Sequence, residues 1–273
     1  MTQPLAVEGV TVKFGGITAV NDVSFTVPPA QVTGLIGPNG AGKTTTFNVI
    51  TGLQTATSGA VRLGDTELTT LAPFRRARLG LARTFQRLEV FGSLTARDNV
   101  RVATEHHRDL HGNAADPDAL LERVGALHVA DEQADALPTG LARLVELARA
   151  LATEPAVLLL DEPGSGLGVT ESEQLGDLLL DLAAEGTAVL LVEHDVELVM
   201  RVCTDITVLD FGTVIAQGTP AEIQKDARVQ DAYLGGTPVC LLGIESKTVR
   251  RHGFPPTDGP DTYTAGTLFP RSS

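Results

Sequence analysis

Residues 37–44 read GPNGAGKT, and the short apolar run QVTGLI precedes them directly at residues 31–36. The spacing G-x-x-x-x-G-K-[ST] is typical of a loop that wraps phosphate groups between a strand and a helix. Glycine lets backbone N–H groups approach the phosphates, and a helix that begins near Lys43 adds the positive end of its dipole. We expect Lys43 to reach the β- and γ-phosphates and the Thr44 hydroxyl to join a Mg²⁺ shell. The alternative is a flexible glycine loop, which the flanking strand and helix disfavour.

A second motif lies further along the chain. The apolar run at residues 156–160 predicts a strand that delivers Asp161 and Glu162 to its carboxyl end, where open α/β sheets place their ligand chemistry. Asp161 is expected to hold Mg²⁺ through water, because a hard cation prefers oxygen ligands. Glu162 could orient or deprotonate an attacking water. The structural alternative is a pair of acidic residues that only end a strand.

Hydrophobic patterning predicts a mixed α/β chain. The nearly continuous apolar runs at 156–160 and 187–192 are typical of strands buried on both faces of a parallel sheet. Residues 5–14 and 20–27 are rich in β-branched residues and flank the turn Gly15-Gly16, which predicts two further strands. The composition of residues 94–151 predicts helices.

The later part of the chain continues this alternation. Thr170 is expected to cap an amphipathic helix at 171–184, and residues 206–209 and 213–216 predict a hairpin. Pro220 is expected at the first position of a short helix. From residue 237 the periodicity stops, which favours a loosely ordered tail.

Bulk composition narrows the class of protein. The formal net charge of −13 disfavours nucleic acid as a partner, because its phosphates would repel the surface. No apolar run approaches the ~20 residues that cross a bilayer, and no secretory signal is evident. We therefore expect a soluble, cytoplasmic protein. Cys203 and Cys240 stand far apart and are expected to be buried free thiols rather than a disulfide or metal ligands.

The two phosphate-site motifs resemble those of P-loop NTPases, and further segments narrow the resemblance to ABC ATPases. In order, these are the aromatic Phe14, LARTFQ at 81–86, LPTGLARLVELARAL at 137–151, GSGLG at 164–168 and LVEHD at 191–195. Each is weak alone: Gln86 could be a surface polar residue, His194 structural and Phe14 part of the core. Their order and spacing together favour the family over about residues 5–236.

This resemblance implies a fold, cofactors and a site. The fold is α/β of the P-loop NTPase type, with a RecA-like core, an antiparallel β-part and a helical subdomain at about 90–152; the cofactors are ATP and Mg²⁺. The implied nucleotide-binding residues are Phe14, Gly37, Pro38, Asn39, Gly40, Ala41, Gly42, Lys43, Thr44 and Thr45. The implied metal site takes Thr44, Gln86 and Asp161, and the implied catalytic residues are Glu162, His194 and Gln86. The implied signature, which closes over a partner's ATP, is Pro138, Thr139, Gly140 and Leu141.

The signature is where the sequence departs from the family pattern. Pro138 replaces a small, often hydroxylated residue, Thr139 replaces the first glycine, and Leu141 replaces glutamine, whereas Gly140 is retained. Proline lacks both a hydroxyl and a backbone N–H that could donate to a phosphate. In the segment GSGLG at 164–168, Gly168 also replaces the aspartate or asparagine that is usual in ABC ATPases. The face offered to a partner is therefore expected to be altered.

Several flanking segments resemble the ATPase subunits of branched-chain amino-acid importers. They include TTTFNVITG at 44–52, VEHD at 192–195, GTPAEI at 218–223 and AYLG at 232–235. The resemblance implies a domain at 1–236, a tail at 237–273, membrane permease subunits, a second ATPase subunit in a homodimer or heterodimer, and indirectly a solute-binding protein. The chain would lie on the inner face of the membrane. Alternatives are a urea or amide importer, a lipid exporter, or a non-transport regulatory ABC protein.

Overall fold

The structure, a computed structural model, describes residues 3–112 and 115–234 of the 273 in the chain. The strands are β1 Leu5–Phe14, β2 Ile17–Val27, β3 Val32–Ile36, β4 Ser58–Leu63, β5 Thr66–Glu67, β6 Leu81–Arg83, β7 Val157–Asp161, β8 Ala188–Val192, β9 Asp205–Asp210 and β10 Thr213–Gly218. The helices are α1 Lys43–Thr51, α2 Pro73–Arg78, α3 Ala96–His111, α4 Pro117–Arg123, the 3₁₀ turn η1 Leu127–Val129, α5 Thr139–Leu151, α6 Val169–Ala184, α7 Val196–Val202, α8 Pro220–Ile223 and α9 Ala227–Leu234.

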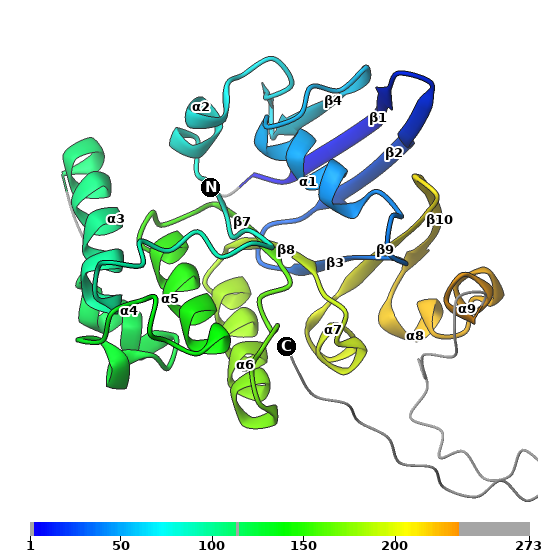
Figure 1. The fold of residues 1–273 in the computed structure, drawn as a ribbon. Coiled ribbons are helices and arrows are strands. Elements are labelled where there is room, and N and C mark those ends of the chain that lie inside the picture. The colour runs from blue at the N-terminus through cyan, green and yellow to red at the C-terminus, as the bar shows by residue number, and fades with distance from the viewer. Residues whose placement is uncertain (1–2, 113–114, 235–273) are drawn as a thin grey trace, which may run out of the picture. The chain divides into compact units, whose positions relative to one another are not determined.

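A six-stranded sheet runs through the centre of the described residues (Figure 1). Its order is β10-β9-β3-β8-β7-β6, and its neighbours are parallel except for the β9–β10 hairpin. Every residue of β3, β7 and β8 is buried. Layers on both faces explain why these strands are continuous apolar runs. The predicted parallel core and the predicted hairpin are confirmed.

Alternate residues of the central strands divide between two hydrophobic cores. Leu158 and Leu160 of β7 face a core completed by α5 and α6, whereas Val157 and Leu159 face a core that contains α1 and the second sheet. Side chains on a strand alternate between its faces, so one strand serves both layers. The second sheet is antiparallel, in the order β2-β1-β4-β5.

Helices α3, α4 and α5 lie together on one side of the central sheet in Figure 1 and pack on one another. Helix α3 begins after Thr95, whose hydroxyl accepts a hydrogen bond from the Asp98 N–H at 3.0 Å. The long helical stretch that the composition predicted is thus divided into separate helices. The subdomain boundaries at 90 and 152 remain predictions, as does the domain boundary at 236, because the tail lies outside the described residues.

The predicted start of α6 is wrong. Thr170 was the expected cap, but the helix begins at Val169 and Gly168 is its N-cap. The Gly168 N–H donates to Glu171 Oε2 at 2.5 Å, so a carboxylate in the first turn pairs with this terminal N–H. Pro220 does begin α8, as predicted.

Two smaller expectations concern cysteine and membranes. Cys203 is a buried free thiol, and burial raises its pKa to about 12, so it is inert at neutral pH. Cys240 lies outside the described residues. Within residues 3–112 and 115–234, no helix is both long enough and apolar enough to span a bilayer.

Candidate functional site

The phosphate loop joins the end of β3 to the start of α1, as the motif predicted. Gly42 immediately precedes the helix with a φ of 105°, and a Cβ there would lie 2.9 Å from the Ala19 carbonyl oxygen. Only glycine fits this position without strain. Lys43 Nζ donates to the carbonyl oxygens of Gly37 at 2.6 Å and Pro38 at 3.0 Å. The lysine side chain therefore lies along the loop.

An open cavity of about 280 Å³ lies beside this loop. It brings together residues from five separate parts of the sequence: Ala19, Asn39, Gly40, Ala41, Gly42, Lys43, Thr44, Thr45, Gln86, Asp161, Glu162, Val192 and His194. Gly37 and Pro38 instead line a neighbouring cavity that also contacts Tyr233. Burial lowers the pKa of Lys43, and the nearby carboxylates of Glu162 and Asp161 oppose that shift.

Glu162 is held between two other predicted catalytic residues. Its Oε1 accepts a hydrogen bond from Gln86 Nε2 at 3.1 Å and lies 3.0 Å from His194 Nε2. Its backbone has a φ of 55°, a left-handed conformation that is uncommon for a residue with a side chain. The Glu162 N–H donates to the Val192 carbonyl at 2.8 Å, which anchors this turn to β8. The structure therefore joins three separate motifs at a single carboxylate.

Sequence reasoning missed Glu193, which organises the same region. Glu193 is buried, and its carboxylate accepts the backbone N–H of Gly164 at 2.6 Å and of His194 at 3.0 Å. Burial raises the pKa of Glu193, and these hydrogen bonds partly offset the shift. Glu193 thereby links the loop after Glu162 to the backbone of His194. A signal was available: an acidic residue directly follows an apolar strand and precedes the predicted histidine.

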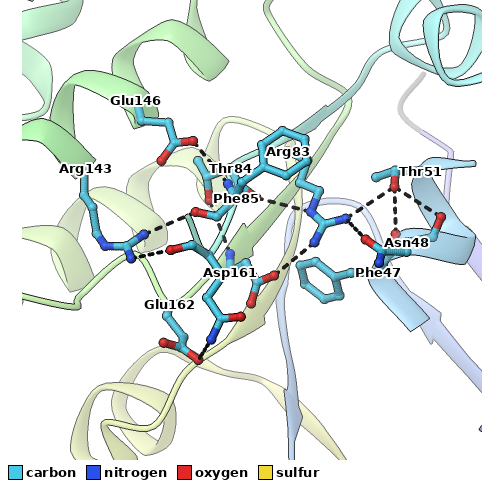
Figure 2. Close-up of polar contacts among 11 residues, drawn as sticks. Phe47, Asn48, Thr51, Arg83, Thr84, Phe85, Arg143, Glu146, Asp161 and Glu162 are labelled. Atoms are coloured by element: carbon cyan, nitrogen blue, oxygen red, sulfur yellow. Dashed lines mark hydrogen bonds and ion pairs between the residues drawn. The ribbon is translucent and has the colours of Figure 1, made fainter. Parts of the chain in front are cut away.

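Asp161 ends β7, and its side chain is only 2% exposed. Its Oδ2 pairs with Arg83 Nη2 at 3.0 Å, and its N–H donates to the Thr84 hydroxyl at 3.3 Å (Figure 2). Burial raises the pKa of Asp161, and the Arg83 charge and hydrogen bond oppose that shift. Arg83 is a second residue that the sequence analysis did not identify.

Helix α5 is tied to the loop that carries Gln86. Arg143 donates to the carbonyl oxygens of Phe85 at 3.3 Å and Gln86 at 2.7 Å, and Glu146 Oε1 accepts the Phe85 N–H at 3.2 Å (Figure 2). Burial raises the pKa of Glu146, an effect that the Phe85 hydrogen bond and the Arg143 charge oppose. A buried pair from one helix therefore holds the backbone of the glutamine loop.

The predicted signature residues lie at the start of α5 and do not line the cavity. Pro138 and Thr139 are exposed, and Gly140 is buried. A Cβ at Gly140 would lie 2.6 Å from the carbonyl oxygen of Gly166. The retained glycine thus has a structural reason within this chain: it packs against the loop that follows Glu162.

Phe14 ends β1 and also lies outside the cavity lining. Its side chain belongs to the large apolar groups at the surface, with an exposure of 49%. That exposure does not fit the alternative in which Phe14 belongs to the core. Its stacking on adenine remains a prediction.

Comparisons with known proteins agree with this geometry. Residues 20–165 match the ABC transporter family, and residues 213–238 match the branched-chain amino acid ATP-binding cassette transporter family. The chain is 40% identical over 253 residues to the high-affinity branched-chain amino acid transport ATP-binding protein LivG of Escherichia coli K12, covering 86% of this chain and 99% of that protein. It is 40% identical over 255 residues to the corresponding protein BraF of Pseudomonas aeruginosa, with 86% and 99% coverage.

A solved structure shares the fold. It is the ADP conformation of MJ1267, an ATP-binding cassette of an ABC transporter, with a TM-score of 0.75 and 29% identity over 86% of this chain and all of that one. Sequence and structure comparisons thus point the same way as the cavity built from residues 39–45 and its converging acidic residues. The chain belongs to the ABC transporter ATP-binding family and is an ATPase.

Proposed function

We propose that this chain energises the import of branched-chain or related amino acids. One observation carries the proposal: the chain matches relatives named for that transport over nearly their whole length. The match at residues 213–238 to a family of the same description adds support near the carboxyl end. These residues include β10, α8 and α9, which lie outside the segment common to ABC transporters in general.

Within the site, the roles follow from position and chemistry. Backbone N–H groups of residues 39–45 and the Lys43 ammonium bind the phosphates of ATP. Glu162 orients the attacking water and accepts its proton, since its carboxylate lines the cavity. His194 and Gln86 hold that carboxylate through the contacts at 3.0 and 3.1 Å. Phe14 provides an exposed ring on which the base stacks.

We further propose Mg²⁺ as the cofactor. Three residues that line the cavity, Thr44, Gln86 and Asp161, offer hydroxyl, amide and carboxylate oxygens, the ligands that a hard cation prefers. Bound there, Mg²⁺ would neutralise negative charge on the phosphates. The donor set fits this ion, because it contains neither thiol nor imidazole.

Partners follow from the incomplete nature of a single chain. The residues at 138–141 lie outside the cavity of their own chain, which supports a role against ATP held by a second ATPase subunit, identical or a sister protein. Such a pair would work with membrane permease subunits on the inner face of the membrane. A solute-binding protein would contact the permease rather than this chain.

Transport measurements test the assignment. We expect deletion of the gene to abolish high-affinity uptake of radiolabelled leucine, and the unaltered chain to restore it. The Glu162→Gln variant should not restore uptake, whereas Glu173→Gln, an exposed residue of α6, should. If uptake of urea or a short amide is lost while leucine uptake persists, the substrate class is wrong. If uptake of all these solutes persists, the importer assignment itself fails.

A further inference from the structure

Arg83 occupies a buried position beside the phosphate site. Its side chain is 6% exposed, and Nη2 contacts Asp161 Oδ2 at 3.0 Å. On the other side of the guanidinium, Nη1 donates to Asn48 Oδ1 at 2.6 Å, and Nε donates to the Thr84 carbonyl at 3.3 Å. Figure 2 shows the arginine between helix α1 and the end of β7. The planar fork thus bridges two elements of the site.

Two aromatic rings complete the surroundings of this arginine. The guanidinium carbon lies 5.3 Å from the centre of the Phe47 ring and 4.9 Å from that of Phe85. Both distances fall within cation–π range. Lys43, the other cation close to Asp161, donates to loop carbonyls instead. In the described part of the chain, Arg83 is therefore the cation in direct contact with the Asp161 carboxylate.

The elements that Arg83 joins carry all three proposed magnesium ligands. Asn48 belongs to α1, whose first turn contains Thr44, and Phe85 directly precedes Gln86. Asp161 is the third ligand. We propose that Arg83 is a positioning residue that sets the spacing of these oxygens for Mg²⁺. This inference rests on the magnesium site of the proposed function, and it adds a residue that does not itself touch the ion.

Arginine is needed because one group must bridge two partners. A lysine ammonium is a point charge and cannot bond Asn48 and Asp161 in the same fixed plane. Removing the charge altogether would leave Asp161 buried without its partner, a change that destabilises folding by itself. Arg83→Lys and Asn48→Ala are therefore the informative variants, because both keep a cation near Asp161.

The chain offers a matched control in Arg76 of α2, which contacts the same helix α1. Arg76 is also buried and also contacts α1, donating to the carbonyl oxygens of Val49 at 2.6 Å and Ile50 at 2.7 Å. Its partners there are backbone carbonyls near the far end of α1, not a proposed ligand. Arg76→Lys thus reproduces the loss of a buried guanidinium fork without altering the Asp161 contact.

The test measures binding of a fluorescent ATP analogue to the full chain, with excess Mg²⁺ and again with EDTA. Residues that orient a metal ligand typically affect metal affinity by roughly 10- to 100-fold. We expect Arg83→Lys to reduce the Mg²⁺-dependent gain in affinity by about tenfold, and to leave affinity in EDTA unchanged. Asn48→Ala should reduce the gain in the same direction, and Arg76→Lys should preserve it.

The outcomes separate the two proposals. If the unaltered chain gains no affinity from Mg²⁺, the magnesium proposal fails, and the role of Arg83 fails with it. If the unaltered chain gains affinity and Arg83→Lys gains as much, only the Arg83 inference is overturned. An equal loss in Mg²⁺ and in EDTA would also overturn it, since that result indicates general damage to the nucleotide site. Should Arg83→Lys fail to fold, Asn48→Ala decides by the same comparison.

Discussion

The cavity beside residues 39–45 and the start of helix α5 differ in how many of their polar groups have partners within the chain. In the cavity, Lys43, Asp161 and Glu162 each have polar partners that fix their side chains. At the start of α5, Pro138 and Thr139 are exposed, and no side-chain hydrogen bond caps the helix. The first is a preorganised site within one chain, and the second is a helix end presented at the surface.

This difference shows which groups an altered signature can still contribute. The first N–H groups of a helix have no partner within the helix, and they carry the positive end of its dipole. Pro138 lacks a backbone N–H, but Thr139, Gly140 and Leu141 keep theirs at the start of the helix. Arg143 and Glu146 also connect the same helix to the Gln86 loop. The two regions are therefore unequal in their chemistry and yet mechanically joined.

The largest expected effect on ATP binding comes from a change in the cavity beside residues 39–45. Lys43→Ala removes an ammonium that lines the cavity, and hydrogen bonds to charged groups contribute about 1.5–3 kcal/mol each. We expect a loss of roughly 100-fold or more in ATP affinity, measured by equilibrium binding. Lys225→Ala, an exposed lysine outside the cavity lining, is the control and should bind normally. Normal affinity in Lys43→Ala would remove this lysine from the phosphate site.

The next effect separates binding from chemistry. Glu162→Gln keeps the shape of the side chain but removes the carboxylate that we propose as the general base, and general bases contribute about 100- to 10,000-fold to rates. We expect steady-state ATP hydrolysis to fall by at least about 100-fold while ATP binding persists and a closed dimer accumulates. Mass in solution with Mg²⁺ and ATP measures the dimer. Near-normal ATP hydrolysis by Glu162→Gln would show that another residue acts as the general base.

A smaller effect is expected from changes at the start of helix α5. The triple change Pro138→Ser, Thr139→Gly and Leu141→Gln adds hydroxyl and amide donors where a partner's phosphate is proposed to lie. Since one such donor can contribute 100-fold or more in other enzymes, we expect turnover of the homodimer to rise by about tenfold. Mixing the unaltered chain with a sister ATPase that carries a full signature should also raise it. Equal turnover before and after the change would show that the helix N–H groups suffice.

The smallest expected effect concerns the adenine base of ATP. Stacking on an aromatic ring contributes about 1–3 kcal/mol, and the half-exposed Phe14 favours the lower end. Phe14→Ala should weaken ATP binding about fivefold, with only a modest change in discrimination between ATP and GTP. Phe74→Ala, another exposed phenylalanine, should have no effect. Unchanged affinity in Phe14→Ala would leave this residue without a role in the site.

The sequence alone determined the features that depend on local backbone chemistry. GPNGAGKT at residues 37–44 predicted a strand, a loop and a helix because glycine, lysine and the flanking apolar run act within a few positions. The run before Asp161 and Glu162 predicted a buried strand for the same reason. The prediction that Thr170 caps α6 was wrong for a local reason: the helix begins one residue earlier, and the Glu171 carboxylate accepts the N–H of Gly168.

Only the tertiary structure revealed the residues that support these motifs. Arg83 meets Asp161 across 78 positions, and Arg143 meets Gln86 across 57. Such pairs depend on which elements become neighbours: β6 lies parallel to β7, with Arg83 opposite Leu159. Which strands become neighbours depends on the burial of whole strands, and the residues next to Arg83 in the sequence do not indicate it. Local chemistry predicted the groups that we propose to contact nucleotide, and the packing of distant strands and helices decided what holds them in position.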